Sequence, residues 1–235
     1  MKNIRKLSIV VPVYNEEKTI GKMLRRIYEV DFGKTKLEVI VVNDGSSDNS
    51  LGVLEKLKKL YPIRIISYKN NRGKSCALRE GFKEVTGEVV TIQDGDLEYE
   101  PKDFVKMLKK ISRDGVQVVY GSRRLNKKNV QYSGLSFYAG GLLLTYMANV
   151  LYGGHITDEP TCYKMFESKL LKGIKIESKR FEFCPEVTAK VLRKGIEIYE
   201  VPISYHPRDI SQGKKIKLKD FFEAVWTLVK YRFVE

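Results

Sequence analysis

Two aspartates flank a glycine in the segment 93–98, where Asp94, Asp96 and Glu98 follow an apolar run and precede a helical pattern. In a loop at the end of a strand, carboxylates with this spacing can converge on one hard cation that also holds phosphate oxygens, as Mg²⁺ and Mn²⁺ commonly do. Such a metal neutralises the charge of a departing diphosphate. A solvated turn is the alternative, because turns are rich in aspartate.

A second acid, Asp44, lies in the segment 43–48, directly after another apolar run. A carboxylate at that point can accept hydrogen bonds from the hydroxyls of a ribose or from a base. The same segment can instead form a turn and cap the next helix, and the two roles are compatible. The first apolar run ends in the sequence PVYNEE at 12–17, without the glycine-rich loop of a Rossmann dehydrogenase or a P-loop kinase.

These acids need a scaffold, and seven short runs rich in β-branched residues predict the strands that supply it. Apolar stripes with helical spacing lie between several of the runs and predict amphipathic helices. Strands that alternate with helices indicate an α/β fold with a mostly parallel sheet, whose ligands bind at the carboxyl ends of the strands. The predicted strands are residues 7–13, 37–43, 63–68, 88–93, 117–122, 161–166 and 198–205. The predicted helical stripes are Ile20, Leu24, Ile27 and Tyr28; Leu51, Leu54, Leu57 and Leu60; Phe104, Val105, Leu108 and Ile111; and the segment 186–192.

The chain has 235 residues, of which 43% are hydrophobic, and a net charge of +14. This composition supports one folded domain over residues 1–235 and excludes a disordered or collagen-like chain. The charge favours an anionic partner, which could be a nucleic acid, a phosphorylated small molecule or an anionic membrane. The three cysteines are far apart and have no metal-ligand spacing, which argues against disulfides or a zinc site and favours a reducing compartment.

Two segments suggest contact with a membrane. Residues 129–157 carry no Asp, Glu, Lys or Arg, but small and polar residues interrupt them. We therefore expect a membrane-interface helix over about 130–155 rather than a transmembrane span, with a soluble core helix as the alternative. A basic amphipathic helix is expected over about 216–233, and both segments predict peripheral attachment to an anionic bilayer. The run 7–13 is interpreted as a buried strand and not as a signal peptide, because it contains a proline and leads into charged residues. The apolar face of the last helix is expected to consist of Phe221, Phe222, Val225, Trp226 and Val229.

Five motifs in a fixed order give these features a family context. They are VPVYNEE at 11–17, NDGSSD at 43–48, NRGK at 71–74, QDGDLE at 93–98 and GSR at 121–123. Together they resemble inverting glycosyltransferases of family 2 with the GT-A fold, and most closely the branch of dolichyl-phosphate mannosyltransferases and polyprenyl-phosphate hexosyltransferases. The resemblance extends over about residues 7–233 and implies a three-layer α/β/α architecture.

The resemblance also implies roles for individual residues. By it, Asp96 and Glu98 ligate Mg²⁺ or Mn²⁺, while Asp96, Arg123 and Asp158 form the catalytic centre. The branch often carries glutamine in place of Glu98, so the metal site of this chain is more negative. An acceptor phosphate would contact Arg123, and Lys127, Lys128, Ser133 or Ser136 would serve where some relatives have a second arginine. The implied donor-binding residues are Pro12, Tyr14, Glu16, Val42, Asp44, Lys74, Asp94, Gly95, Asp96, Arg208 and Lys214.

The expected function is the metal-dependent, inverting transfer of a hexose from GDP-mannose or UDP-glucose to a polyprenyl phosphate of the dolichyl type. A lipid phosphate is anionic at neutral pH and needs no strong general base. Transfer to a sugar hydroxyl of a glycan is the alternative, with Asp158 or Glu159 as the candidate base. A nucleotidyltransferase is disfavoured because the first loop is not glycine-rich, and a nucleic-acid-binding protein is disfavoured because no recognised module is present.

The expected location is the cytoplasmic face of the cell membrane, where the enzyme would meet its donor and its lipid acceptor. This interpretation includes no nucleic-acid partner. It leaves room for a membrane-anchoring partner protein.

Overall fold

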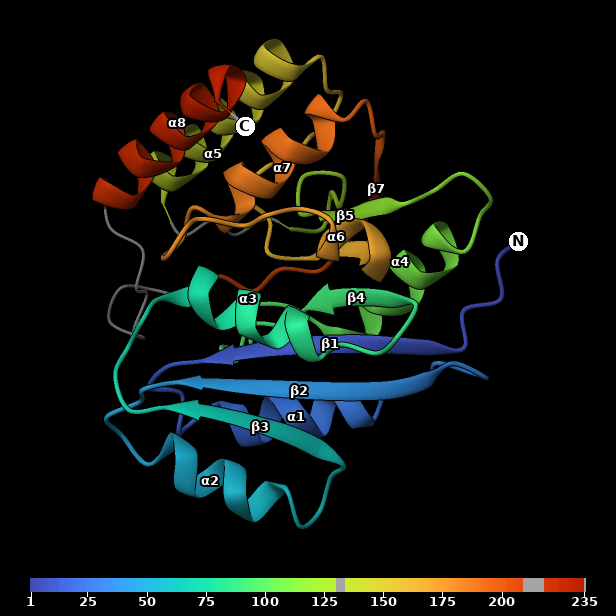
Figure 1. Ribbon diagram of the computed structural model, residues 1–235, viewed down its shortest axis with the longest axis vertical. Coiled ribbons are helices and arrows are strands. Elements are labelled where there is room, and N and C mark those ends of the chain that lie inside the picture. Colours follow the sequence, from blue (N-terminus) through green and yellow to red (C-terminus); the bar gives the residue numbers. More distant parts are fainter. Residues whose placement is uncertain (130–133, 209–217, 235) are drawn as a thin grey trace.

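A seven-stranded sheet forms the centre of the computed structural model, which describes residues 1–129, 134–208 and 218–234 (Figure 1). The strand order is β3-β2-β1-β4-β6-β5-β7. Strand β6 pairs antiparallel with β4 and β5, whereas the other pairings are parallel. The predicted α/β fold with a mostly parallel sheet is confirmed. The strands are β1 (Lys6–Val13), β2 (Lys36–Asp44), β3 (Ile63–Tyr68), β4 (Val89–Ile92), β5 (Val118–Ser122), β6 (Lys164–Glu167) and β7 (Ile198–Pro202).

Helices cover both faces of this sheet. In Figure 1, α1 and α2 lie on the far side of β1–β3 from α3, and α5, α7 and α8 lie together beside the other half of the sheet. The GT-A architecture of three layers is therefore confirmed. The helices are α1 (Ile20–Tyr28), α2 (Ser50–Leu57), α3 (Lys74–Glu84), α4 (Phe104–Ile111), α5 (Leu135–Tyr152), α6 (Ser168–Lys172), α7 (Phe183–Arg193) and α8 (Leu218–Phe233), with a 3₁₀ turn at Pro101–Asp103.

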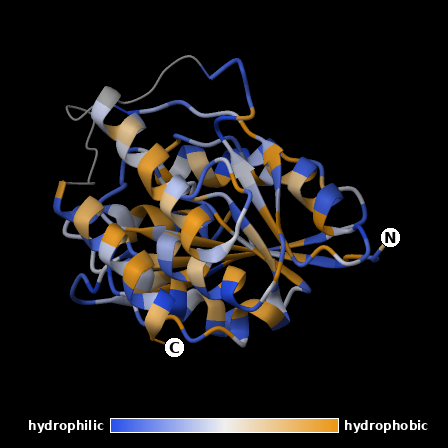
Figure 2. Ribbon diagram, turned by 90° about the horizontal axis from the view of Figure 1, so that it is seen from above, coloured by the Kyte–Doolittle hydropathy of each residue, from blue (hydrophilic) through white to orange (hydrophobic). Residues whose placement is uncertain are grey.

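Alternate residues of the parallel strands feed two hydrophobic cores. In β1, Val10 packs into the core shared with α3, α5, α7 and α8, whereas Ile9 and Val11 pack into the core shared with α1, α2 and α4. Since side chains alternate across a strand, a strand that is apolar along its whole length must be covered on both faces. Figure 2 shows the hydrophobic residues along these central strands and mixed surfaces on the surrounding helices.

The leucine stripe predicted for α2 is only partly correct. The helix ends at Leu57, so Leu60 lies beyond it and is 74% exposed, while Leu51 is 38% exposed. Leu54 is fully buried and carries most of the packing. A stripe with i, i+3 spacing drifts around the helix, because 3.6 residues make one turn. Four residues at this spacing therefore cannot all face the same core.

The ends of two strands also differ from the prediction. Strand β6 begins at Lys164 rather than at 161, because residues 158–162 form the loop that reaches the sheet edge. Strand β7 ends at Pro202, after which Tyr205 makes an isolated bridge to Tyr99. In both places the apolar pattern continues beyond the ladder, because the loops themselves are buried.

The uncharged segment forms α5, which packs against α8. An added Cβ at Gly140 would lie 3.3 Å from the Phe221 ring, so this glycine lets the two helices approach closely. Within the apolar face expected for α8, Phe222 is 62% exposed and Trp226 is 66% exposed. Ala224, Leu228 and Tyr231 face the core instead. Among the residues that the structure describes, no helix has the length and apolarity needed to cross a bilayer.

Candidate active site

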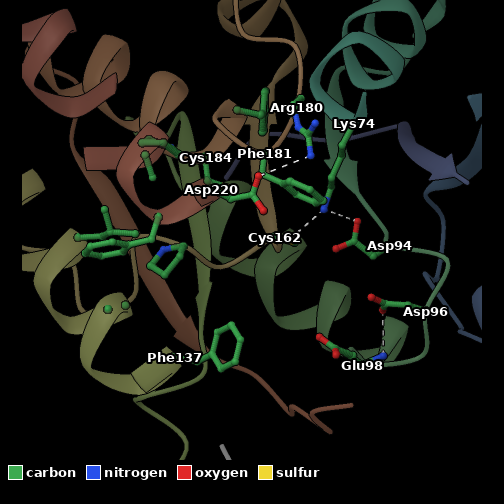
Figure 3. A pocket seen from close by; sticks show the side chains of 18 of the residues that line it. Lys74, Asp94, Asp96, Glu98, Phe137, Cys162, Arg180, Phe181, Cys184 and Asp220 are labelled. Carbon is green, nitrogen blue, oxygen red and sulfur yellow. Dashed lines mark hydrogen bonds and ion pairs between the residues drawn. The ribbon is translucent and has the colours of Figure 1, made fainter. Parts of the chain in front are cut away.

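A cleft of about 920 Å³ opens at the carboxyl ends of β1, β2, β4 and β5. Its walls come from the loops that follow these strands and from α5, α7 and α8. Figure 3 shows its two chemical halves: Asp94, Asp96 and Glu98 lie on one side, and Phe137 lies on the side of the helices. The position agrees with the rule that open α/β sheets bind ligands beyond the carboxyl ends of their strands.

Asp44 closes the end of the cleft beside β2. Its carboxylate accepts hydrogen bonds from Asn71 Nδ2 at 3.0 Å, from the Arg72 amide at 2.9 Å and from the Gly73 amide at 2.7 Å. Burial raises the pKa of Asp44 above its ordinary value, although the two amides and Arg72 oppose that shift. These contacts fix the loop before α3, and Asp44 still borders the cleft, so it can also meet a ribose or a base.

Lys74, the first residue of α3, lies at the centre of the cleft. Its Nζ is 2.6 Å from Asp94 Oδ1 and 3.2 Å from Cys162 Sγ. Burial alone would lower the pKa of Lys74, but the Asp94 carboxylate raises it well above its usual value. Lys74 therefore keeps its positive charge, which balances the negative charge of the ionised Asp94 carboxylate.

The other acids of the loop after β4 meet Arg208. Its Nη2 lies 2.8 Å from Asp96 Oδ2, its Nε lies 3.5 Å from Glu98 Oε1 and its Nη1 lies 3.7 Å from Glu16 Oε2. Burial, followed by the charges of Asp94 and Glu98, raises the pKa of Asp96 to about 7. Among the residues that the structure describes, one guanidinium thus faces three carboxylates.

This donor set fits a hard divalent cation, since it offers carboxylate oxygens with excess negative charge. Within residues 1–129, 134–208 and 218–234, no three His, Cys, Asp or Glu side chains are arranged to hold a metal ion by themselves. A metal on Asp96 and Glu98 would therefore need further oxygens from a ligand such as a diphosphate.

Arg123, directly after β5, forms a two-pronged ion pair with Asp158. Its Nε is 2.7 Å from Asp158 Oδ2 and its Nη2 is 2.6 Å from Asp158 Oδ1, while its own amide also donates to Oδ2 at 2.9 Å. Burial would raise the pKa of Asp158, but Arg123 lowers it below its usual value. Asp158 is fully buried, so its carboxylate orients Arg123 toward the cleft rather than facing a ligand itself.

The opposite half of the cleft is mostly apolar, although the ion pair between Arg180 and Asp220 also borders the cleft. Phe137 and Leu144 of α5, Phe221 and Ala224 of α8, and Phe181 from the loop before α7 border it. Arg124 stands at the junction, where its guanidinium lies 4.8 Å from the Tyr138 ring centroid. This half can take a hydrocarbon chain while the basic residues hold an anionic group.

The structure brings most of the sequence-predicted site residues to one cleft. Val42 instead lies in the core of β2, Lys127 is exposed outside the cleft, and Lys214 lies outside the described residues. The residues of the predicted site that line the cleft are Pro12, Tyr14, Glu16, Asp44, Lys74, Asp94, Gly95, Asp96, Glu98, Arg123, Ser136 and Arg208.

Several cleft residues had no role in the sequence interpretation. Asn71 belongs to a motif that resembles the family, and its side chain supports Asp44. Tyr205 donates a hydrogen bond to Glu98 Oε2 at 3.2 Å and lies under the Arg123 guanidinium, 5.0 Å from ring centroid to Cζ. Tyr205 lies three residues before Arg208, and the sequence interpretation gave it no role at the site.

Comparison with known families identifies the chain as one of a large group. Residues 8–174 match the model of glycosyl transferase family 2. A dodecaprenyl-phosphate galacturonate synthase from Rhizobium johnstonii is 25% identical over 211 residues, which cover 88% of this chain and 61% of that protein. A dolichyl-phosphate beta-glucosyltransferase from Trichomonas vaginalis is 30% identical over 240 residues, which cover 95% of this chain and 72% of that protein.

Solved structures agree on the fold. Glucosyl-3-phosphoglycerate synthase from Mycobacterium tuberculosis, in complex with Mn²⁺, uridine diphosphate and phosphoglyceric acid, superposes with a TM-score of 0.74 at 18% identity. The superposition covers 98% of this chain and 80% of that chain.

Proposed function

Because the chain belongs to glycosyl transferase family 2, we propose that it transfers a hexose from a nucleotide diphosphate sugar to a polyprenyl phosphate, with inversion. GDP-mannose and UDP-glucose are the leading donors. The relatives named above act, by their names, on dodecaprenyl phosphate and dolichyl phosphate. A divalent metal, Mg²⁺ or Mn²⁺, completes the proposed site.

The division of the cleft into an acidic half and an apolar half carries this proposal. A sugar acceptor would call for hydrogen-bonding side chains along its length, whereas α5 and α8 present mainly Phe137, Leu144 and Phe221. Asp220 of α8 also lines the cleft, where it pairs with Arg180. A polyprenyl phosphate matches both parts of the acceptor side, since its phosphate suits Arg123 and its chain suits the apolar wall.

In the proposed reaction, Asp44 binds the ribose or base while Lys74 stands beside the diphosphate. Asp96 and Glu98 would hold a divalent metal, which would offset charge on the departing nucleoside diphosphate. Arg123 orients the acceptor phosphate, whose oxygen attacks the anomeric carbon from the face opposite the diphosphate. The bond from this carbon to the diphosphate breaks as the new bond forms.

No strong base is required for this step. The acceptor phosphate is already an anion at neutral pH. Asp158 is committed to Arg123 by two side-chain contacts and is fully buried, so it acts as a positioning residue. For a hydroxyl acceptor, a free carboxylate near the acceptor would be needed, and the geometry of Asp158 does not favour that role.

The test is an assay for product in the organic phase. The protein is incubated with Mg²⁺ or Mn²⁺, a short-chain polyprenyl phosphate and, separately, radiolabelled GDP-mannose, UDP-glucose and UDP-N-acetylglucosamine. We expect lipid-phase label from one donor, lost in Asp96→Asn and retained in Asp114→Asn. Asp114 is a matched control because it is 80% exposed and pairs with the N-terminal amine. No lipid-phase label from any donor, together with measurable binding of a nucleotide, would favour the hydroxyl alternative.

The proposed location is the surface of an anionic membrane, with α5 and α8 as the contacting elements. Tyr146 and Val150 of α5 are 67% and 63% exposed, and Phe222 and Trp226 of α8 are similarly exposed. Aromatic side chains and basic residues such as Lys219 suit the boundary between headgroups and acyl chains. This placement would let a lipid enter the apolar half of the cleft from the bilayer. A membrane-anchoring partner protein is compatible with it.

A further inference from the structure

Arg208 occupies the position in which a metal ion would meet the acidic loop. Its guanidinium contacts Asp96 at 2.8 Å, Glu98 at 3.5 Å and Glu16 at 3.7 Å. These three acids come from the loops after β1 and β4, far from Arg208 in the sequence. A guanidinium is always charged at physiological pH, so it serves these carboxylates as a cation in the absence of any ligand.

The main chain holds this arginine in place. The Arg208 amide donates to Glu98 Oε1 at 3.0 Å, and the His206 amide donates to the Glu98 carbonyl oxygen at 2.8 Å. Tyr205 donates its hydroxyl to the other carboxylate oxygen of Glu98. Each carboxylate oxygen of Glu98 therefore already accepts a hydrogen bond from the segment after β7, and these contacts compete with a metal ion.

The protein side of the metal site is also incomplete. Asp96 and Glu98 supply two carboxylates, and the described residues hold no third metal-binding side chain in a suitable arrangement. Hard divalent cations such as Mg²⁺ and Mn²⁺ take six oxygen ligands in most sites, with substrate phosphates often among them. A free metal ion would thus have to displace Arg208 for only two carboxylates.

We propose that Arg208 is a resting counter-ion that excludes free metal from Asp96 and Glu98, so that the metal and the donor diphosphate bind as a unit. This rests on the proposed function for the identity of the donor. The diphosphate contributes oxygens to the metal and gives the displaced guanidinium a new anionic partner, since planar guanidinium groups pair well with phosphate oxygens. Each ligand therefore increases the affinity of the other, because binding linkage is reciprocal.

The test measures metal binding directly, without donor sugar or acceptor. Mn²⁺ is titrated into the protein and its free concentration is followed by electron paramagnetic resonance, with and without inorganic pyrophosphate as a base-independent diphosphate. In the wild type, pyrophosphate should tighten Mn²⁺ binding about tenfold or more beyond the Mn²⁺–pyrophosphate association measured in solution. Arg208→Gln should bind Mn²⁺ alone about tenfold more tightly than the wild type and should show a smaller effect of pyrophosphate.

Arg72→Gln is the matched control. This substitution also removes one positive charge near the cleft. In the wild type, however, the Arg72 guanidinium carbon lies 4.9 Å from the Tyr68 ring centroid and not on the acidic loop. An equal gain of Mn²⁺ affinity in Arg208→Gln and Arg72→Gln would show that only the net charge of the protein matters, and it would overturn the proposal. So would an Arg208→Gln affinity equal to that of the wild type. If Arg208→Gln does not fold, an absence of pyrophosphate linkage in the wild type still overturns it.

The outcome is separable from that of the transfer assay. Loss of the counter-ion effect with lipid product still formed would reject this inference and keep the proposed function. A clear counter-ion effect with no lipid product from any donor would keep this inference and move the acceptor to another class.

Discussion

Asp158 and Glu159 are consecutive acids, both fully buried, yet their surroundings push them toward opposite protonation states. Arg123 keeps Asp158 ionised by its two-pronged contact. Among the described residues Glu159 forms no ion pair, and burial raises its pKa to about 7, although the charge of Lys164 opposes the shift. Neighbouring residues in a sequence can thus differ in chemistry because one forms a close ion pair and burial dominates the surroundings of the other.

Glu159→Gln tests the second half of this statement. The folded chain holds the Glu159 proton to higher pH than the unfolded chain does, so folded protein binds more protons between about pH 4.5 and 7. The contribution of protonated Glu159 to the free energy of unfolding is complete below that pH window and is lost as the pH rises through it. We expect the variant to match the wild type at pH 5 and to exceed it by on the order of 3 kcal/mol at pH 8.

Thermal unfolding of both proteins at pH 5, 6, 7 and 8 measures the difference. Other acids titrate in the same range, but they are common to both proteins and cancel in the comparison. A gap in melting temperature that stays constant with pH would show that Glu159 is ionised throughout.

Asp158→Asn tests the positioning of Arg123. The substitution leaves a buried guanidinium without its anion, and breaking a buried pair in this way costs about 3–5 kcal/mol. We expect a lower melting temperature than that of the wild type. We also expect the KM for the acceptor to increase more than the KM for the donor, since Arg123 is the residue that would meet the acceptor phosphate. Arg123→Gln combined with Asp158→Asn should recover part of the stability, because no unpaired charge remains. Additive losses in the double variant would contradict the pairing.

Much of the site was accessible from the sequence at this scale. The acids of the loops after β1, β2 and β4 could be placed because strand ends at one edge of a parallel sheet converge. The pairing of Arg208 with Asp96, Glu98 and Glu16 could not be placed, since it depends on how the segment after β7 folds back over the cleft. The burial of Val42 was missed because a strand residue beside the cleft can point into either core.

At the scale of elements, the start of α3 depends on one glycine. Gly73 has φ of +98°, and a Cβ there would lie 2.3 Å from the Lys179 carbonyl oxygen. The Gly73 amide donates a hydrogen bond to Asp44. The same turn therefore makes room for the main chain at Lys179 and completes the hydrogen bonds of Asp44. The glycine therefore joins the packing of α3 to the proposed nucleotide end of the cleft.

Gly73→Ala should strain this turn by about 1–3 kcal/mol or push Lys179 away. We expect lower thermal stability together with weaker binding of a nucleoside diphosphate, measured by calorimetry with GDP and UDP. Gly115→Ala is the control, because Gly115 also has a positive φ of +79° but nothing lies within 4 Å of its Cβ position. The control should lose stability from backbone strain alone. Nucleotide affinity that falls equally in both variants would refute the link to Asp44.

Helix faces were harder to predict than helix existence. The α8 segment reads as strongly apolar on one side, yet Phe222 and Trp226 point outward while Ala224 and Leu228 face the core. Helical periodicity gives relative directions only. Which side meets the protein depends on the close approach of α5 at Gly140, a tertiary contact that no local pattern encodes.

At the scale of the whole molecule, the outward residues of α8 should mediate membrane binding. Phe222→Ser with Trp226→Ser removes two large apolar side chains that are more than 60% exposed, so little folding stability should be lost. We expect weaker flotation with vesicles rich in phosphatidylglycerol, and weaker binding of the wild type as salt increases.

Leu60→Ser is the matched control, since Leu60 is 74% exposed but follows α2 on the other side of the sheet from α3. It should bind vesicles as the wild type does. Vesicle binding that is equally strong in the α8 double variant would place the contacting surface elsewhere. Equal binding to neutral and anionic vesicles would show that the basic residues do not contribute to membrane binding.

The reversed direction of β6 bears on how such a protein can diversify. The loops after β1, β2 and β4 approach the cleft from strand ends within the first hundred residues, whereas 158–162 enter it ahead of β6. The proposed donor-binding acids and the apolar acceptor wall are thereby encoded in separate stretches of the gene, apart from Arg208. Mutation or recombination can therefore change one segment while the other is preserved. Exchanging 134–157 and 218–234 between relatives, with Arg208 left in place, would then alter acceptor choice more readily than the choice of nucleotide.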